Sequence, residues 1–178
     1  MLLSQFVKTV SIPILILALS LSAVPVRSEQ AAITATPQTL YVVPFLNVMI
    51  PENVSVNFFD AFIDDLMETG DAYGLKVRIL KQGIDTVDRE WLAQQYFVTG
   101  ELFDYQEDSG CCSTGLTAAA RIYYYQPGVV APKTEILVPG DVFFDHDLSN
   151  IEKEQYRLGA EMATRLTSRL FAKIFPAL

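Results

Sequence analysis

The sequence predicts an α/β (α+β) domain: a mixed sheet of about five strands in the order β-α-β-α-β-β-β-α, with helices mainly on one face. Three observations carry this prediction. Residues 40–48 form a run that is apolar on both faces, residues 54–67 repeat apolar side chains at helical spacing, and residues 151–174 do so over a longer C-terminal stretch. A continuous apolar run is typical of a buried strand, and an apolar stripe of period 3.6 is typical of a helix packed on a sheet.

The first 28 residues are predicted to be a secretory signal peptide. Lys8 is the only charged residue before Arg27, and residues 10–24 are almost entirely apolar, with small residues towards their end. A positive start, a short apolar stretch and small residues before the cleavage point are the features that signal peptidase reads. Residues 1–28 are therefore expected to be absent from the mature protein.

Cleavage is expected before Glu29, because Val26 and Ser28 occupy the positions that precede such a cleavage site; cleavage after Ala23 is an alternative. The apolar stretch of about 15 residues is shorter than the ~20 residues that cross a bilayer, and an uncleaved membrane anchor is the competing interpretation. No cysteine follows this stretch at the place where bacterial lipoproteins are acylated. We expect a periplasmic protein without a lipid anchor and without a direct membrane span after signal cleavage.

Residues 29–39 are predicted to be a flexible leader and residues 40–178 a single α/β domain, because no later linker divides the chain. Removing the signal peptide takes away two of the 13 basic residues and none of the 21 acidic ones. Eleven basic residues then remain against 21 acidic ones, a net charge of −10. Phosphate binding needs clustered lysine and arginine, so this charge argues against nucleic acid and anionic lipid as partners.

The first predicted strand, 40–48, contains Pro44, which weakens the prediction because proline cannot donate to a central ladder. An amphipathic helix follows, and Gly70 is placed to end it. Alternating apolar and polar residues over 75–80 predict a half-exposed strand. A short helix is expected around 89–95, with Trp91 and Leu92 turned inward.

Three further strands and a long helix complete the domain. The helix is expected to start with a capping box, Ser149 followed by Glu152 three residues later. Its end carries basic residues, which suit the negative end of a helix dipole. The three strands cover residues 96–105, 116–125 and 133–144, the last as one strand or as two short ones broken at Pro139-Gly140.

The two cysteines, Cys111 and Cys112, are adjacent in the loop-like segment DSGCCSTG. No long-range staple can join neighbours, and a disulfide between them would be strained. A local oxidised clasp (a vicinal disulfide) or two free thiols are favoured, and an intermolecular bridge is the other interpretation. A redox or metal role is disfavoured because no Cys-x-x-Cys motif is present.

No catalytic residue, cofactor site or metal site is predicted. His146 lies between two aspartates, but the chain lacks the glycine and the final glutamate of a calcium loop and the glycine-flanked serine of a hydrolase elbow. The densest carboxylate clusters are interpreted as solvated charge rather than as catalytic pairs. These clusters are Asp64, Asp65 and Glu68, and Asp104, Glu107 and Asp108.

An aromatic set is the most informative candidate for a binding surface. If helices cover one face of the sheet, residue parity places Glu101 and five aromatic or arginine side chains on the other face. Tyrosine, phenylalanine and arginine are enriched at the centre of protein interfaces. The competing interpretation is that the leader or a second layer covers them. The predicted interface residues are Phe103, Tyr105, Arg121, Tyr123 and Tyr125.

Two phrases of the sequence resemble a known family. Residues 41–47, YVVPFLN, resemble a first-strand motif in which apolar residues precede Pro-Phe and an asparagine. Ala93 and residues 96–102, YFVTGEL, resemble a later motif built around a glycine. On these motifs and the order of elements the chain resembles the periplasmic domain of the TolB amino-terminal and CsgG type, with relatives FlgO, FlgT and PelC. The resemblance covers about residues 40–174, and these domains are not enzymes.

The resemblance implies a non-enzymatic periplasmic accessory or scaffold protein that assists assembly of a bacterial envelope structure or a secretion or export machine. Its expected partners are envelope proteins, with self-association as a further option. The alternative from the residues alone is a small periplasmic ligand-binding protein or hydrolase that uses the acidic clusters.

Overall fold

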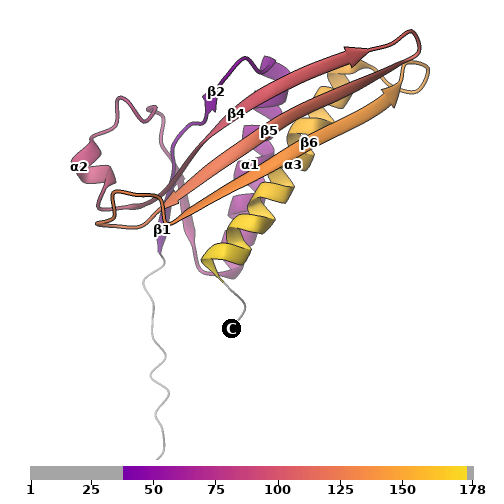
Figure 1. Cartoon of the computed structure of the whole chain (residues 1–178). Coiled ribbons are helices and arrows are strands. Elements are labelled where there is room, and N and C mark those ends of the chain that lie inside the picture. The colour runs from indigo at the N-terminus through magenta and orange to yellow at the C-terminus, as the bar shows by residue number, and fades with distance from the viewer. Residues whose placement is uncertain (1–37, 176–178) are drawn as a thin grey trace, which may run out of the picture. The chain divides into compact units, whose positions relative to one another are not determined.

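The computed structural model describes residues 38–175, so the predicted signal peptide and residues 29–37 of the predicted leader lie outside the described part. The order of elements matches the prediction, with one strand added (Figure 1). In chain order the elements are β1 (Thr39–Val42), β2 (Leu46–Asn47), α1 (Glu52–Ala72), β3 (Lys76–Ile79), α2 (Arg89–Leu92), β4 (Tyr96–Ser109), β5 (Ser113–Tyr125), β6 (Thr134–Asp145) and α3 (Ile151–Ile174).

The predicted first strand is divided in two at Pro44. β1 lies between β3 and β4 and is parallel to both, whereas β2 pairs only with β4. Proline has no N–H to offer a ladder, so the pairing stops there and resumes two residues later. The sheet therefore has six strands instead of about five, in the order β3-β1-β4-β5-β6 with β2 continuing beside β4.

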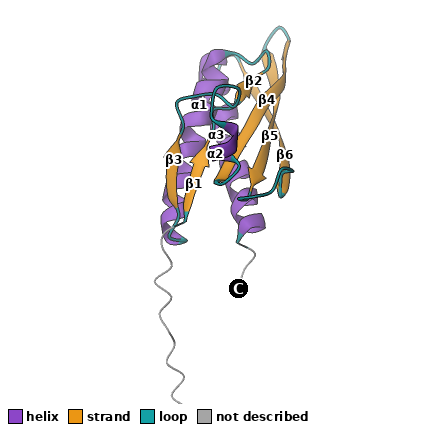
Figure 2. Cartoon of the chain, turned by 90° about the vertical axis from the view of Figure 1, so that its left-hand side faces the viewer, coloured by secondary structure: helices purple, strands orange, loops and turns teal. Residues whose placement is uncertain are grey.

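The two long helices cover one face of the sheet, as predicted. α1 and α3 pack side by side along the sheet (Figure 2). Phe58 and Phe62 of α1 and Leu158 and Met162 of α3 are fully buried between the helices and the strands. Gly159 of α3 allows the close approach, because a Cβ there would stand only 2.7 Å from the Val54 carbonyl oxygen.

A second, smaller apolar cluster lies on the other face, at the end of the sheet where α2 is found. Val43, Leu92 and Phe97 are buried in it, so Leu92 is turned inward as predicted. The prediction for Trp91 was wrong. Its side chain remains 39% exposed and lies edge-on against Tyr41, with the ring centres 5.0 Å apart.

The helix ends differ from the predicted caps. Asn150, not Ser149, caps α3, since its side chain accepts a hydrogen bond from the Lys153 N–H. The Ser149 hydroxyl donates instead to the Glu154 carboxylate. α1 continues two residues past Gly70, and Gly74 with φ +67° follows its end.

The β4–β5 pairing contains an irregularity that the sequence did not reveal. Asp104 has φ +63°, and the register shifts between Phe103 and Gln106. A bulge of this kind inserts an extra residue into one strand and reverses which side chains point to which face beyond it. Residues after Asp104 therefore do not follow the parity of those before it.

Candidate interaction surface

Among residues 38–175, no helix packs over the middle of the sheet face opposite α1 and α3. Cross-strand neighbours form three rows across β4, β5 and β6. We call these residues the open face; the rows are Thr99–Tyr123–Glu135, Glu101–Arg121–Leu137 and Phe103–Ala119–Pro139. Leu46 of β2 extends the second row, since it pairs with Glu101.

Arg121 lies at the centre of the open face and is held from several sides. Its guanidinium carbon is 5.1 Å from the centre of the Phe103 ring, a cation–π arrangement. Nη1 lies 3.2 Å from Glu101 Oε1, and Nε lies 3.3 Å from Glu135 Oε1, an ion pair without hydrogen-bond geometry. Nη1 also donates to the Tyr123 hydroxyl at 3.4 Å, which is the main reason why the pKa of Arg121 is raised.

The structure thus brings together three of the five predicted interface residues, Phe103, Arg121 and Tyr123, with the Glu101 that parity placed beside them. Each comes from a position that alternates with buried residues of the helix-facing side, such as Leu102 and Ile122. Strand alternation explains why parity was sufficient here. Whether the surface binds a partner stays a prediction.

The placement of Tyr105 on this face was wrong. Tyr105 packs against the helix-side core, and its hydroxyl accepts a hydrogen bond from Gln155 Nε2 of α3 at 2.9 Å. The bulge at Asp104 turns it to that side. Burial raises the pKa of Tyr105 above its ordinary value.

Tyr125 lies on the predicted side of the sheet but not on the open face. Its ring stacks on Phe97, with centres 4.4 Å apart, in the cluster near α2. Together with Val129 and Val130 these rings line a cleft of about 290 Å³. A local layer around α2 therefore covers this end, which is one form of the competing interpretation. The other form, cover by the predicted leader, concerns residues 29–37, which lie outside the described part.

Cys111 and Cys112 lie at the turn between β4 and β5, and both thiols are exposed. The two Sγ atoms are 3.2 Å apart, in contact but not bonded. Contact with Cys111 raises the pKa of the Cys112 thiol. A vicinal disulfide on oxidation stays a prediction.

A chain of polar side chains, which the sequence did not predict, fixes this turn to the loop before α3. His146 Nε2 lies 2.8 Å from Thr114 Oγ1, which lies 3.0 Å from Ser109 Oγ, and Ser109 donates to Glu107 at 3.1 Å. Each hydroxyl has one proton, so Thr114 must donate to Ser109, and His146 must donate from Nε2. The sequence gives little sign of this chain of hydrogen bonds, because the residues that form it are up to 39 positions apart.

The two acidic clusters lie on different elements, one along α1 and one at the end of β4. Of the first, Asp65 accepts a hydrogen bond from Thr164 of α3. Over residues 38–175 no group of three or more His, Cys, Asp or Glu side chains is arranged to hold a metal ion. Over the same residues no helix has the length and apolar character of a membrane span.

Comparison with known proteins finds solved structures of similar architecture at low identity. PelC of Paraburkholderia phytofirmans, solved as a dodecamer, is 16% identical with a TM-score of 0.45, over 75% of this chain and 90% of that one. Lipoprotein GNA1162 of Neisseria meningitidis is 16% identical with a TM-score of 0.46, over 79% of this chain and 100% of that one. A minor lipoprotein of Acinetobacter baumannii is 10% identical with a TM-score of 0.43, over 78% of this chain and 93% of that one.

No protein-family model matches the sequence, and no curated protein matches it either. At these identities and TM-scores nothing about function follows from the solved structures. The resemblance to the TolB and CsgG domains stays a prediction.

Proposed function

We propose that the mature chain is a non-enzymatic periplasmic accessory or scaffold protein that helps assemble a bacterial envelope structure or an export machine, and that its open face binds the partner. The observation that carries this proposal is the cluster of Phe103, Arg121 and Tyr123 at the middle of a sheet face over which no helix of residues 38–175 packs. Aromatic and arginine side chains supply most of the binding energy in interfaces of this kind.

The chemistry of the open face suits a protein partner. Leu137 is 48% exposed beside Arg121, and Phe103 and Pro139 lie in the adjoining row, so apolar side chains border the paired arginine. The cation is already paired within the face, so a partner that covers it need not supply a counter-charge. Because Arg121 is already held in place before binding, less side-chain entropy is lost when a partner associates.

The location rests on the predicted signal peptide. Mass spectrometry of the protein purified from bacteria that express the full chain should give an N-terminus at Glu29 in the periplasmic fraction. An intact N-terminus in the membrane fraction would show an anchored protein and contradict the periplasmic placement.

The face itself is tested by the double variant Phe103→Ala with Tyr123→Ala. We expect an unchanged circular dichroism spectrum and a loss of the partner that co-purifies with the wild-type protein, or of the oligomer seen by light scattering. Tyr156→Ala is the matched control, because Tyr156 is 58% exposed on α3, away from the open face. Equal recovery of partners or oligomers with the double variant and the control would refute the proposal.

A further inference from the structure

Three edges of the sheet in the described part of the chain have no strand beside them. They are the outer edge of β3, the outer edge of β6, and the edge formed by β2 and by the part of β4 beyond Leu102. An unpaired edge presents a row of N–H and C=O groups onto which another strand can add, and proteins usually protect such edges with charges, proline or covering groups.

The edge of β6 is protected. Arg169 donates from Nη1 to the Leu137 carbonyl at 2.9 Å, and Arg165 donates to the Pro139 carbonyl at 3.4 Å. Pro139 itself has no N–H. The outward carbonyls in the middle of this edge are therefore already occupied by side chains of α3.

The edge of β3 is short and charged. Only four residues pair with β1, and two of them, Lys76 and Arg78, are basic. An incoming strand would have to lie against these charges, which is a common protection of exposed edges.

The edge of β2 has no such protection. Leu46, Val48 and Met49 are 53%, 46% and 93% exposed, and none of the three is charged. The Val48 N–H donates to the Leu102 carbonyl of β4 at 2.8 Å, so strand alternation directs the N–H of Asn47 outward. The Asn47 side-chain oxygen accepts a hydrogen bond from the Ile50 N–H at 2.9 Å. This side chain therefore does not cap the outward N–H of Asn47.

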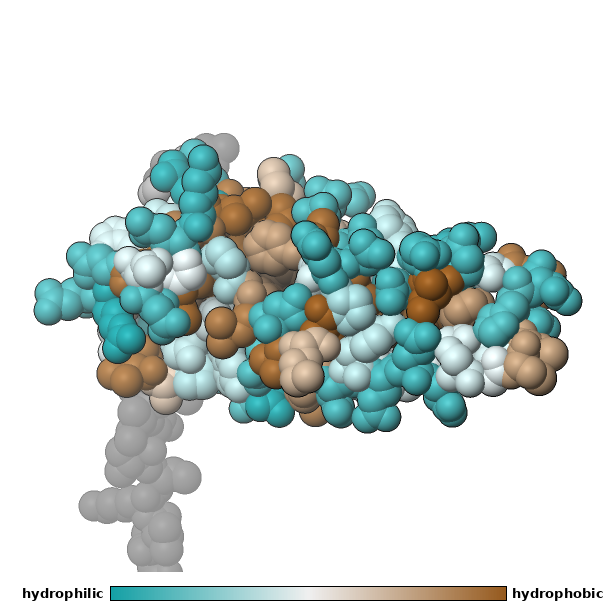
Figure 3. Space-filling view, turned by 90° about the horizontal axis from the view of Figure 1, so that it is seen from above, coloured by the Kyte–Doolittle hydropathy of each residue, from teal (hydrophilic) through white to brown (hydrophobic). Residues whose placement is uncertain are grey.

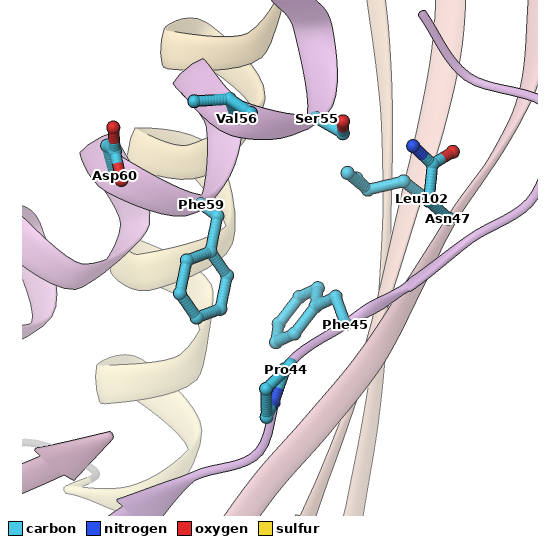
Figure 4. A pocket seen from close by; sticks show the side chains of 8 residues that line it. All are labelled: Pro44, Phe45, Asn47, Ser55, Val56, Phe59, Asp60 and Leu102. Atoms are coloured by element: carbon cyan, nitrogen blue, oxygen red, sulfur yellow. The ribbon is translucent and has the colours of Figure 1, made fainter. Parts of the chain in front are cut away.

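A cleft of about 240 Å³ lies directly beside this edge, between β2 and α1 (Figure 4). The rings of Phe45 and Phe59 meet in it edge to face, with centres 6.0 Å apart. Val56 forms part of its wall and is 49% exposed. Gly100 leaves room for the Phe45 ring, since a Cβ there would lie 2.7 Å from it. A strand added to β2 would therefore place alternate side chains into an apolar cleft.

The backbone next to the cleft is held in an unfavourable conformation. Met49 has φ +57°, a backbone conformation that residues other than glycine rarely adopt. Its side chain is almost fully exposed. Such positions cluster at binding sites. Figure 3 shows the molecule from above the view of Figure 1, in which β2 lies in the upper part. On this face apolar residues gather in patches between polar ones.

The charge beside the cleft is negative. α1 contains six acidic residues and no lysine or arginine, and Asp60 lines the cleft itself. None of the ion pairs between described residues involves α1. A second copy of this chain would bring the same acidic helix, so charge favours a basic occupant.

From these observations we propose that β2 is a strand-addition site for an extended segment of another protein, apolar at alternate positions and flanked by lysine or arginine. The segment lies along β2 as a further strand, fills the cleft at Phe45 and Phe59, and pairs its cations with Asp60 and its acidic neighbours on α1. This site uses the edge of the sheet and the cleft, so it goes beyond the proposed function of the open face and can fail separately from it.

The test uses a blocked peptide of sequence Lys-Val-Thr-Val-Thr-Val-Lys and the isotope-labelled protein, purified from cells that express the full chain. Nuclear magnetic resonance should show saturable shifts at residues 45–49 and 55–60 and slower hydrogen exchange at the Asn47 amide. Val56→Lys should weaken binding about tenfold or more, because it places a charge in the cleft. Val130→Lys is the matched control, since Val130 is 97% exposed near α2.

Added salt should also weaken binding, because charges near the surface are screened. The proposal would be overturned by no shifts at saturating peptide, by shifts confined to the open face, or by equal binding of the Val56 and Val130 variants. Unchanged exchange at the Asn47 amide would show that the peptide occupies the cleft without adding a strand, and would also overturn it.

Discussion

Gly159 and Gly70 offer a paired test of how closely α1 and α3 pack. Both glycines lie within helices, where replacing glycine by alanine gains up to about 1 kcal/mol of helix propensity. The space around them differs. A Cβ at Gly159 would stand 2.7 Å from the Val54 carbonyl oxygen and 3.0 Å from the Phe58 nitrogen, whereas a Cβ at Gly70 would have its nearest contact at 3.4 Å.

The structure therefore predicts effects of opposite sign. In Gly159→Ala the helix backbones must move apart, and overpacking typically costs about 1–3 kcal/mol. Because the nearest atoms are backbone atoms that cannot rotate away, we expect a cost in the upper part of this range, which exceeds the propensity gain. We expect a net loss of roughly 1–2 kcal/mol, or a fall in Tm of about 3–8 °C for a domain of this size. Gly70→Ala should leave the free energy of unfolding unchanged or raise it by up to about 1 kcal/mol.

Both variants are to be measured by urea and thermal unfolding, followed by circular dichroism at the helix signal. The comparison removes the propensity term, which the two substitutions share. If Gly159→Ala proves as stable as Gly70→Ala, the two helices are not held at the spacing that the structure shows, and the close contact between their backbones would have to be abandoned.

Three further predictions concern β4 and the edge of β6. Asp104→Ile should lower the free energy of unfolding by about 1–2 kcal/mol in urea titrations, because a β-branched residue fits a positive φ poorly; an unchanged value would argue against the bulge. Arg169→Ala frees the Leu137 carbonyl and should increase light scattering with concentration, and unaltered scattering would show that the arginine does not protect the edge. Tyr105 has a raised pKa when folded, so its contribution to stability is complete below pH ~10 and is lost as the pH rises through the folded pKa. Tyr105→Phe should lose about 1 kcal/mol near neutral pH with the Gln155 hydrogen bond and should show a smaller decline above pH ~10; parallel pH curves for both proteins would contradict the burial of this hydroxyl.

Local patterns in the sequence determined the elements and most of the sheet faces. Apolar spacing located α1 and α3, and alternation along β5 placed Arg121 and Tyr123 on one face and Ile122 on the other. These features depend only on residues close in the chain, so period and parity were sufficient. The interruption at Pro44 was visible as well, although not its consequence, a separate strand.

Only the tertiary structure decided the features that depend on distant residues or on a single backbone torsion. The positive φ of Asp104 turned Tyr105 to the helix side, and the segment around α2 covered Tyr125, neither of which alternation could anticipate. The unprotected edge of β2 likewise exists because β3 ends at Ile79, beside β1, and does not extend past Pro44. Side-chain direction is a local property of a strand, whereas what lies beside a strand is fixed by how the whole chain packs.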